Sequence, residues 1–167
     1  MTNTTNSNGI FERLGELLKP DTALLQHLES KAIAAHRNVS FDPELRGEQM
    51  INEYSEELTN DLHELKDGGA NDECVSDYKA RYERYFTSYL HAKSNTFSVM
   101  ITGGGNFPVR RHEKANRSRE RHYDIFREWR QRAKKAIIRK AQPEKTYNSE
   151  LDRYRAELAG MQANHLK

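Results

Sequence analysis

The side chains most able to do chemistry lie in one short basic run. Six cationic residues fall between positions 110 and 121, where the acidic residues are Glu113 and Glu120. Arginine and lysine contact phosphates and give nucleic-acid affinity that depends on salt but little on base sequence. The candidate binding residues for nucleic acid or another partner are Arg110, Arg111, Lys114, Arg117, Arg119 and Arg121.

Spacing and charge leave two interpretations of this run open. On a helix, spacing of three and four residues places Arg117, Arg121 and Lys114 on a common face. Farther along, Arg127, Arg130, Lys134 and Arg139 are expected to extend an exposed positive surface. The first interpretation is contact with phosphates. The second is that the acidic helix expected over 48–67 neutralises these charges within the molecule.

The charge of the chain is unevenly distributed. Its net charge is +2, yet residues 1–106 hold 10 basic and 17 acidic residues, a balance of −7. Residues 107–140 hold 13 basic and 4 acidic residues, a balance of +9, and the remainder is neutral. Such asymmetry indicates a basic patch that meets an anion or the acidic half of the same protein.

Catalytic chemistry has weaker candidates. His112, Glu113, His122 and Asp124 are titratable, but the chain has no His-Glu-x-x-His and no histidine pair four residues apart. The single cysteine, Cys74, excludes an intramolecular disulfide and a cysteine-based zinc cluster. The sequence therefore predicts no catalytic residue, no metal and no cofactor.

A glycine-rich loop precedes the basic run. Backbone N–H groups of glycines can turn toward an anion, and a following helix N-terminus adds its positive end. The Gly-Lys-Ser/Thr of a phosphate loop is missing, so a tight connection between packed elements is the other interpretation. The loop residues are Thr102, Gly103, Gly104, Gly105 and Asn106.

Apolar spacing predicts a mainly α fold: a single-domain helical bundle with a central antiparallel helical hairpin, one short extended segment and the Gly-rich loop. Stripes at three- and four-residue spacing place the hairpin helices over 44–66 and 71–93. Gly68-Gly69 predicts the turn between them, and Asn71 or Asp72 the next cap.

The chain is expected to begin with a disordered N-terminus over residues 1–8, and one helical domain is expected over residues 9–167. Short helices are expected over 10–18 and up to about His36, and Pro43 suits the first position of a helix. The start lacks the basic and apolar regions of a signal peptide. No apolar run approaches the roughly 18 residues that span a bilayer.

After the hairpin, alternating apolar residues predict the extended segment over 94–101. A basic loop and helix are expected over 107–140, with the helix starting near Asn116 or Ser118 and ending before Pro143. A C-terminal helix over 148–164 is expected to bury a stripe whose 4-3-4-3 spacing resembles a coiled-coil seam. The stripe is Tyr147, Leu151, Tyr154, Leu158 and Met161.

The single tryptophan, Trp129, has two interpretations. It could stack on a nucleobase. Its position in the apolar stripe of Phe126 and Ala133 favours packing in the core.

A longer pattern runs from the extended segment into the basic helix. It reads Ser-x-Met-Ile-Thr-Gly, Asn-Phe-Pro, Arg-x-x-Lys-x-Asn and Phe-Arg-x-Trp-Arg. Its residues are Ser98, Met100, Ile101, Thr102, Gly103, Phe107, Pro108, Arg111, Lys114, Asn116, Phe126, Arg127, Trp129 and Arg130.

This pattern resembles a poorly characterised group of proteins from bacteriophages and mobile elements, over about residues 45–140. Many of those proteins have Pro-Ala where this chain has Gly104-Gly105, so this loop is expected to be more flexible. The resemblance carries no catalytic residue across. It implies phage or mobile DNA and the cytoplasm of a bacterial host.

The function expected is that of a non-enzymatic phage or mobile-element protein that binds nucleic acid through the basic loop and helix. The alternative is a phage anti-defence protein, for example a CRISPR nuclease inhibitor, that binds a host nucleic-acid-binding effector protein. A structural or assembly protein is the third interpretation, with a homo-oligomer formed through helices. No membrane partner is expected.

Overall fold

A computed structural model describes residues 24–105 and 107–165, without the side chains of 143–148, 159–160 and 162–165. The described residues form helices and turns and contain no strand, so the mainly α prediction is confirmed. The predictions for residues 1–8 and 10–18, and for Asn106, lie outside the described residues.

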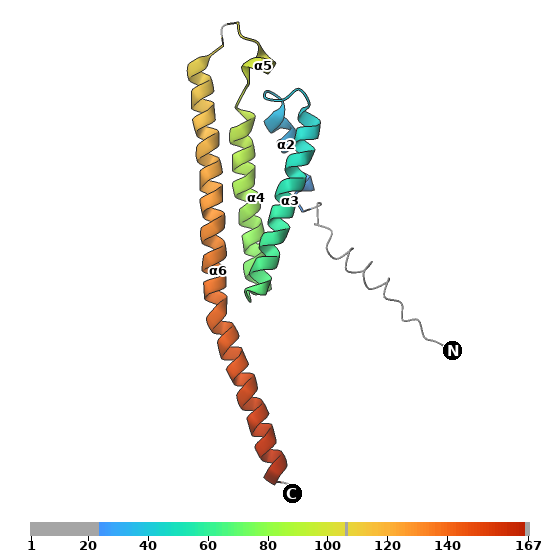
Figure 1. The fold of residues 1–167 in the computed structure, drawn as a ribbon, viewed down its shortest axis with the longest axis vertical. Coiled ribbons are helices and arrows are strands. Elements are labelled where there is room, and N and C mark those ends of the chain that lie inside the picture. Colours follow the sequence, from blue (N-terminus) through green and yellow to red (C-terminus); the bar gives the residue numbers. More distant parts are fainter. Residues whose placement is uncertain (1–23, 106, 166–167) are drawn as a thin grey trace, which may run out of the picture.

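Two long helices are set by the caps and stripes that the sequence contains. Helix α3 spans Pro43–Asp67, and the Asp42 carboxylate accepts a hydrogen bond from the Leu45 N–H at 3.0 Å. After a turn in which Gly69 has a φ of 91°, α4 spans Asp72–Ser94 and returns alongside α3 (Figure 1). Asn71 caps α4 by accepting from the Cys74 N–H at 2.9 Å.

The N-terminal described segment packs against these two helices. A short 3-10 helix η1, Gln26–Leu28, leads into α2, Glu29–His36, which contacts both α3 and α4. The predicted helix ending at His36 is thus present. Gly47 of α3 lies so close to α2 that an added Cβ would be 2.8 Å from the Ile33 backbone nitrogen. This close approach requires glycine.

The last helix is longer than expected. Helix α6 spans Val109–His165 as one element, whereas the sequence predicted a start near Asn116 or Ser118 and a break at Pro143. The N–H of His112 donates to the Pro108 carbonyl at 3.0 Å, four positions earlier, and this bond closes the first turn of α6. The ring of Pro108 fixes its φ near the helical value, which favours a helix start at this point. A proline inside a helix removes one N–H donor and bends it, and α6 changes direction below the bundle (Figure 1).

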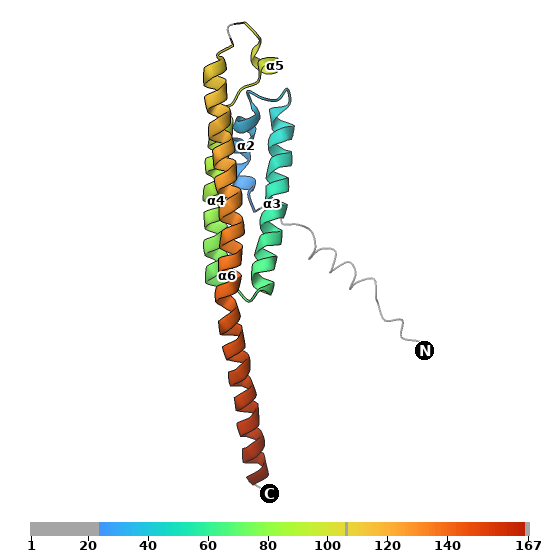
Figure 2. The same cartoon turned by 60° about the vertical axis from the view of Figure 1, so that its left-hand side comes forward.

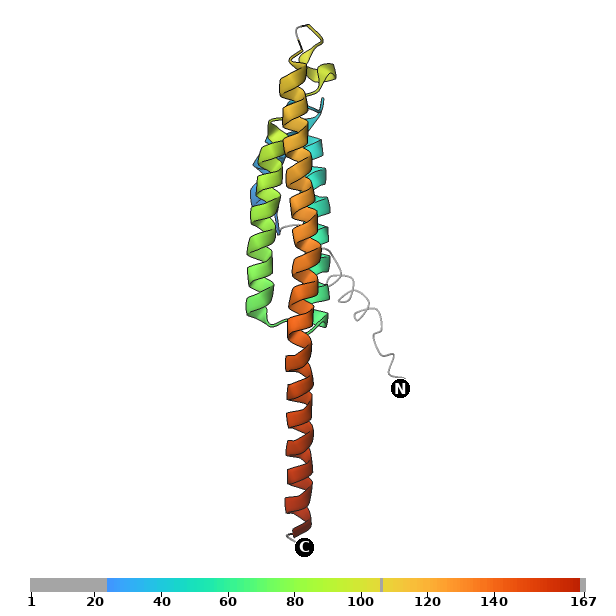
Figure 3. The ribbon, with the colours of Figure 1, turned by 90° about the vertical axis from the view of Figure 1, so that its left-hand side faces the viewer.

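Helix α6 covers the bundle along its N-terminal half and then leaves it. It packs against α4 and, less extensively, against α3 (Figures 2 and 3). Phe126 of α6 is fully buried and joins Tyr54, Tyr82 and Phe86 in an aromatic core.

The connection from α4 to α6 corrects another prediction. In place of an extended segment over 94–101, a short helix α5 spans Val99–Thr102. The Ser98 side chain accepts from the Met100 N–H, and the Thr102 hydroxyl donates to the Ser98 carbonyl at 2.9 Å. With no neighbouring strand among the described residues, these local hydrogen bonds outweigh the alternating pattern.

Candidate nucleic-acid interface

The early start of α6 makes the whole basic run helical. Arg110, Lys114, Arg117 and Arg121 follow one another at spacings of four, three and four residues, which is one helix face. At 100° per residue this face lies on the opposite side of α6 from the buried Phe126. All four side chains are exposed. We call these four residues the upper basic stripe; it is about 16 Å long at 1.5 Å per residue.

The four cations of the upper basic stripe are not paired within the described residues, although the exposed Glu113, Glu120 and Asp124 lie nearby on the same helix. In the part of the chain that the structure describes, none of its four side chains forms an ion pair or a side-chain hydrogen bond. The first turn of α6 contains no acidic residue. Cations at a helix N-terminus face the positive end of the helix dipole, which is unfavourable unless an anion is present.

The remaining predicted residues of the run lie elsewhere. Arg111 is exposed to one side of the stripe, beside the loop. Arg119 lies on the inward side of α6, is partly buried, and contacts Glu120 at 3.2 Å. The structure therefore brings Arg110, Lys114, Arg117 and Arg121 together and separates Arg111 and Arg119 from them.

Two titratable side chains at this end of the bundle have pKa values that are lowered mainly by burial and further by neighbouring cations. Burial lowers the pKa of the half-buried Lys93 ammonium, and the Arg119 charge lowers it further. Burial lowers the pKa of His36 to about 4, with further lowering by Lys93 and Arg46. His36 is therefore uncharged at neutral pH.

Farther along α6, the basic residues have a different environment. Arg130 donates to both oxygens of Asp61, at 2.8 Å for Nη2 to Oδ1, and it also pairs with Glu57. Lys134 contacts Asp61 at 2.7 Å and pairs with Glu64. The expectation that Arg130 and Lys134 extend an exposed surface is wrong, because both lie against α3 and are mostly buried. We call Asp61, Glu57, Arg130 and Lys134 the ion cluster.

Asp61 is the centre of the ion cluster. Its side chain is 1% exposed and also accepts from the Tyr78 hydroxyl at 2.7 Å. Burial acts to raise the Asp61 pKa, but hydrogen bonds from Arg130, Lys134 and Tyr78 outweigh it and lower the pKa. For Lys134, burial acts to lower the pKa, whereas bonds to Asp61 and Glu64 raise it. The cluster is therefore ionised and internally compensated at neutral pH.

The second interpretation of the basic residues holds for part of α6, because Arg127, Arg130 and Lys134 pair with α3. The first interpretation, contact of the upper basic stripe with phosphates, stays a prediction. Sequence reasoning missed the ion cluster, although one signal was present: Asp61 and Arg130 each lie within the apolar stripe of their own helix.

An aromatic cluster and a cavity adjoin the start of α6. The rings of Phe97, Phe107 and His112 lie within 5.4 Å of one another, centroid to centroid. Gly103 has a φ of 84°, a conformation that favours glycine. A cavity of about 320 Å³ is lined by Asn38, Phe97, Thr102, Gly103, Gly105, Phe107, Pro108 and Arg111. It combines aromatic faces, amide and hydroxyl groups and one guanidinium.

The predicted loop therefore lines a cavity in part. Thr102, Gly103 and Gly105 contribute to its wall, whereas Gly104 is exposed near Val99. The Ser98 N–H donates to the Asn38 carbonyl at 2.9 Å, which ties the loop to the end of α2.

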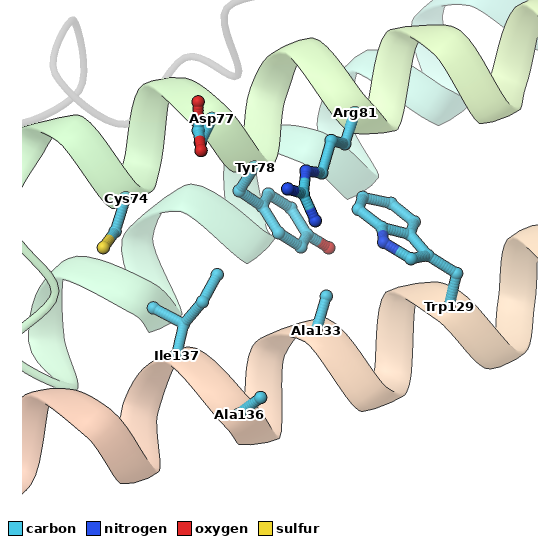
Figure 4. Close-up of a pocket in the computed structure, with 8 residues that line it drawn as sticks. All are labelled: Cys74, Asp77, Tyr78, Arg81, Trp129, Ala133, Ala136 and Ile137. Atoms are coloured by element: carbon cyan, nitrogen blue, oxygen red, sulfur yellow. The ribbon is translucent and has the colours of Figure 1, made fainter.

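A second hollow lies between α4 and α6 (Figure 4). It measures about 200 Å³ and is lined by Cys74, Asp77, Tyr78, Arg81, Trp129, Ala133, Ala136 and Ile137. Trp129 stacks on Tyr78 and Tyr85 with ring centroids 5.2 and 4.6 Å away. These contacts support the core-packing interpretation of Trp129. Cys74 is partly buried in this wall, and no histidine is among the residues that line it.

The catalytic candidates do not converge. The His112 ring is engaged with Asn116 at 2.8 Å, and His122 with the Ser118 carbonyl at 2.7 Å, while Glu113 and Asp124 are exposed. Among the described residues, no three histidine, cysteine or carboxylate side chains are grouped to hold a metal. None of the described helices has an apolar stretch that could cross a membrane.

Comparisons with protein-family models, with curated proteins and with solved structures found no match to the chain. The resemblance to phage and mobile-element proteins therefore stays a prediction.

Proposed function

We propose that this protein binds nucleic acid through the upper basic stripe. The observation that carries the proposal is the contrast in partners: the cations of the ion cluster are compensated by α3, whereas those of the stripe are not. Here the antiparallel hairpin of α3 and α4 is the rigid scaffold on which α6 presents the stripe. Uncompensated exposed cations in a row bind phosphates with release of counterions.

Three features of the same end of the bundle support this proposal. The positive end of the α6 dipole adds to the charges of the stripe. Arg46, Lys93 and Arg119 add further positive charges near this end of the bundle. The adjoining cavity offers Phe97 and Phe107 as apolar surfaces beside the Arg111 guanidinium. Aromatic side chains beside a basic groove are typical of single-strand binding, because every base has a face that can stack.

A matched pair of variants tests the proposal. Lys114, Arg117 and Arg121 have the same spacing and composition as Arg132, Lys135 and Arg139, which follow on the same outward side of α6. Between the two triplets lie Asp124 and Glu128, and Arg132 is paired with Glu128 at 2.7 Å. Glu113, Glu120 and Asp124 lie within four positions of the first triplet, and Glu128 lies within four positions of the second. Acidic neighbours therefore do not favour the first triplet, and the two differ mainly in distance from the α6 N-terminus and its adjoining cavity.

The measurement is fluorescence anisotropy with single- and double-stranded oligonucleotides at low salt. Replacing Lys114, Arg117 and Arg121 by alanine is expected to weaken binding more than about tenfold. The triplet variant Arg132→Ala, Lys135→Ala, Arg139→Ala is expected to weaken it less than about threefold. Absence of wild-type binding, or an equal loss in the two variants, would overturn the proposal. Phe107→Ala is expected to weaken single-strand binding only.

A second candidate function rests on the acidic face of α3. Glu44, Glu48, Glu53 and Glu56 are exposed and form no ion pair with any described residue. Exposed carboxylates on α3 together with a basic stripe on α6 also fit a phage anti-defence protein that binds a host nucleic-acid-binding effector. Affinity purification of the tagged chain from bacterial cells separates the two candidate functions. A host protein that is recovered in stoichiometric amount after nuclease treatment favours binding of an effector protein. Partners that are lost on nuclease treatment favour binding of nucleic acid.

A further inference from the structure

The C-terminal part of α6 carries an apolar stripe that the bundle does not cover. Tyr154, Leu158 and Met161 are 54%, 59% and 56% exposed, and Leu151 is partly buried. The prediction that this stripe is buried is wrong for Tyr154, Leu158 and Met161 in the single chain, while the Tyr147 side chain lies outside the described residues. In all three ribbon views this part of α6 extends beyond the other described elements (Figures 1, 2 and 3).

The spacing of these residues is that of a coiled-coil seam. Leu151, Tyr154, Leu158 and Met161 are separated by three, four and three residues, which are successive a and d positions of a heptad. Such a stripe on one helix is completed by the same stripe on another helix. An isolated helix with so short a seam is marginal in water. Here the helix is already formed by the bundle, so pairing does not have to nucleate it.

The charges beside the seam indicate which helix can pair with it and whether the two helices run parallel or antiparallel. With Leu151 and Leu158 at position a, Glu150 and Glu157 fall at g and Arg155 falls at e. In a parallel coiled coil, a g residue faces the e residue of the other helix five positions later, so Glu150 of one copy faces Arg155 of the other. In an antiparallel pair g faces g, which would oppose glutamates to each other. The Arg155 side chain is free to exchange partners, because its 3.3 Å contact with Asp152 is highly exposed on both sides.

We infer that a second copy of this chain docks on this stripe, giving a parallel homodimer through 150–161. Two reciprocal Glu150–Arg155 pairs flank its apolar seam. Residues 150–161 begin 29 positions after Arg121, about 43 Å along the helix, so dimerisation leaves the upper basic stripe free. The upper basic stripes of the two copies then lie at the same end of the dimer. Two linked sites bind a common ligand more tightly than either site alone.

Sedimentation velocity of the full chain over a range of concentrations tests this inference. The wild type is expected to shift from monomer to dimer below about 100 µM, a modest affinity suited to a short seam. Leu158→Ala should weaken dimerisation more than tenfold. Because Leu158 is exposed in the single chain, its replacement should leave the urea unfolding midpoint of dilute protein unchanged.

Charge exchange tests the direction and the pairing. Glu150→Arg alone and Arg155→Glu alone should each weaken the dimer, because each opposes like charges. The double variant restores opposite charges and is expected to return the dimer to within about threefold of wild type. A chain that is monomeric at all concentrations, or a dimer indifferent to Leu158→Ala, would overturn the inference. A double variant as weak as the single ones would also overturn it.

Discussion

Two stretches of α6 with similar composition have opposite environments. Residues 110–121 and 127–134 are both rich in arginine and lysine, and both lie on one continuous helix. In the second stretch, Arg130 and Lys134 are held against α3 by Asp61. In the first, Arg110, Lys114, Arg117 and Arg121 point to the side opposite Phe126. Whether a cation is available to a partner therefore depends on helix phase and on the opposing helix, and local charge density does not decide it.

The largest expected effect comes from the centre of the ion cluster. Asp61→Ala removes the shared counter-charge of Arg130 and Lys134 and leaves both cations mostly buried. Breaking a buried ion pair in this way costs about 3–5 kcal/mol of unfolding free energy. Urea denaturation measures the change. The exposed Glu53→Ala on the same helix is the control, and a loss below about 1 kcal/mol for Asp61→Ala would remove the cluster from the account of stability.

Trp129→Ala is expected to have the next largest effect. The indole stacks on two tyrosines of α4 and is partly exposed, so its removal should cost about 2–4 kcal/mol. Nucleic-acid affinity of the folded protein should be unchanged, because the ring is engaged within the bundle. A variant of wild-type stability that has lost single-strand binding would show instead that Trp129 stacks on a base.

Acid should also act on the ion cluster. The folded-state pKa of Asp61 lies below its ordinary value, so its carboxylate stabilises the fold above the unfolded pKa of about 4. This stability is lost as the pH falls through the folded pKa. Thermal unfolding between pH 7 and 3 should show a decline below about pH 4 that is weaker in Asp61→Asn. Equal declines in the two proteins would assign the acid sensitivity to other groups.

The smallest effect on stability is expected at the upper basic stripe. Replacing Arg110, Lys114, Arg117 and Arg121 by alanine removes no ion pair and no side-chain hydrogen bond with another described residue. The free energy of unfolding should change by less than about 1 kcal/mol, since alanine is a good helix former and like charges are removed. A loss comparable with that of Asp61→Ala would mean that these side chains serve the fold.

The sequence predicts the elements whose signals are local and leaves out those that depend on helix pairing. Pro43, Gly69 and Asn71 mark α3 and α4 correctly because caps and turns depend on nearby backbone groups. The start of α6 was misplaced because Asn116 and Ser118 are good caps, yet the chain already turns into a helix after Pro108. Pro143 predicts the end of a helix, but a long helix can continue through a proline with a bend, and α6 does so.

The candidate site was predictable only as a set of residues. The sequence identifies the six cations between 110 and 121. However, the predicted helix start at Asn116 or Ser118 places Arg110, Arg111 and Lys114 in a loop. Their division into an outward stripe and inward residues depends on where α6 begins. The pairing of Arg130 with Asp61 joins residues 69 positions apart, and no local pattern specifies which faces of α3 and α6 meet.

The salt dependence of nucleic-acid binding measures directly whether the upper basic stripe contacts phosphates. If the upper basic stripe contacts phosphates, the slope of log affinity against log salt for duplex DNA is about −0.9 for each phosphate neutralised. The account predicts that Lys114→Ala, Arg117→Ala, Arg121→Ala flattens the wild-type slope by up to about 2.7, and that the Arg132, Lys135 and Arg139 variant leaves it nearly unchanged. A slope that is the same in all three proteins would contradict the account.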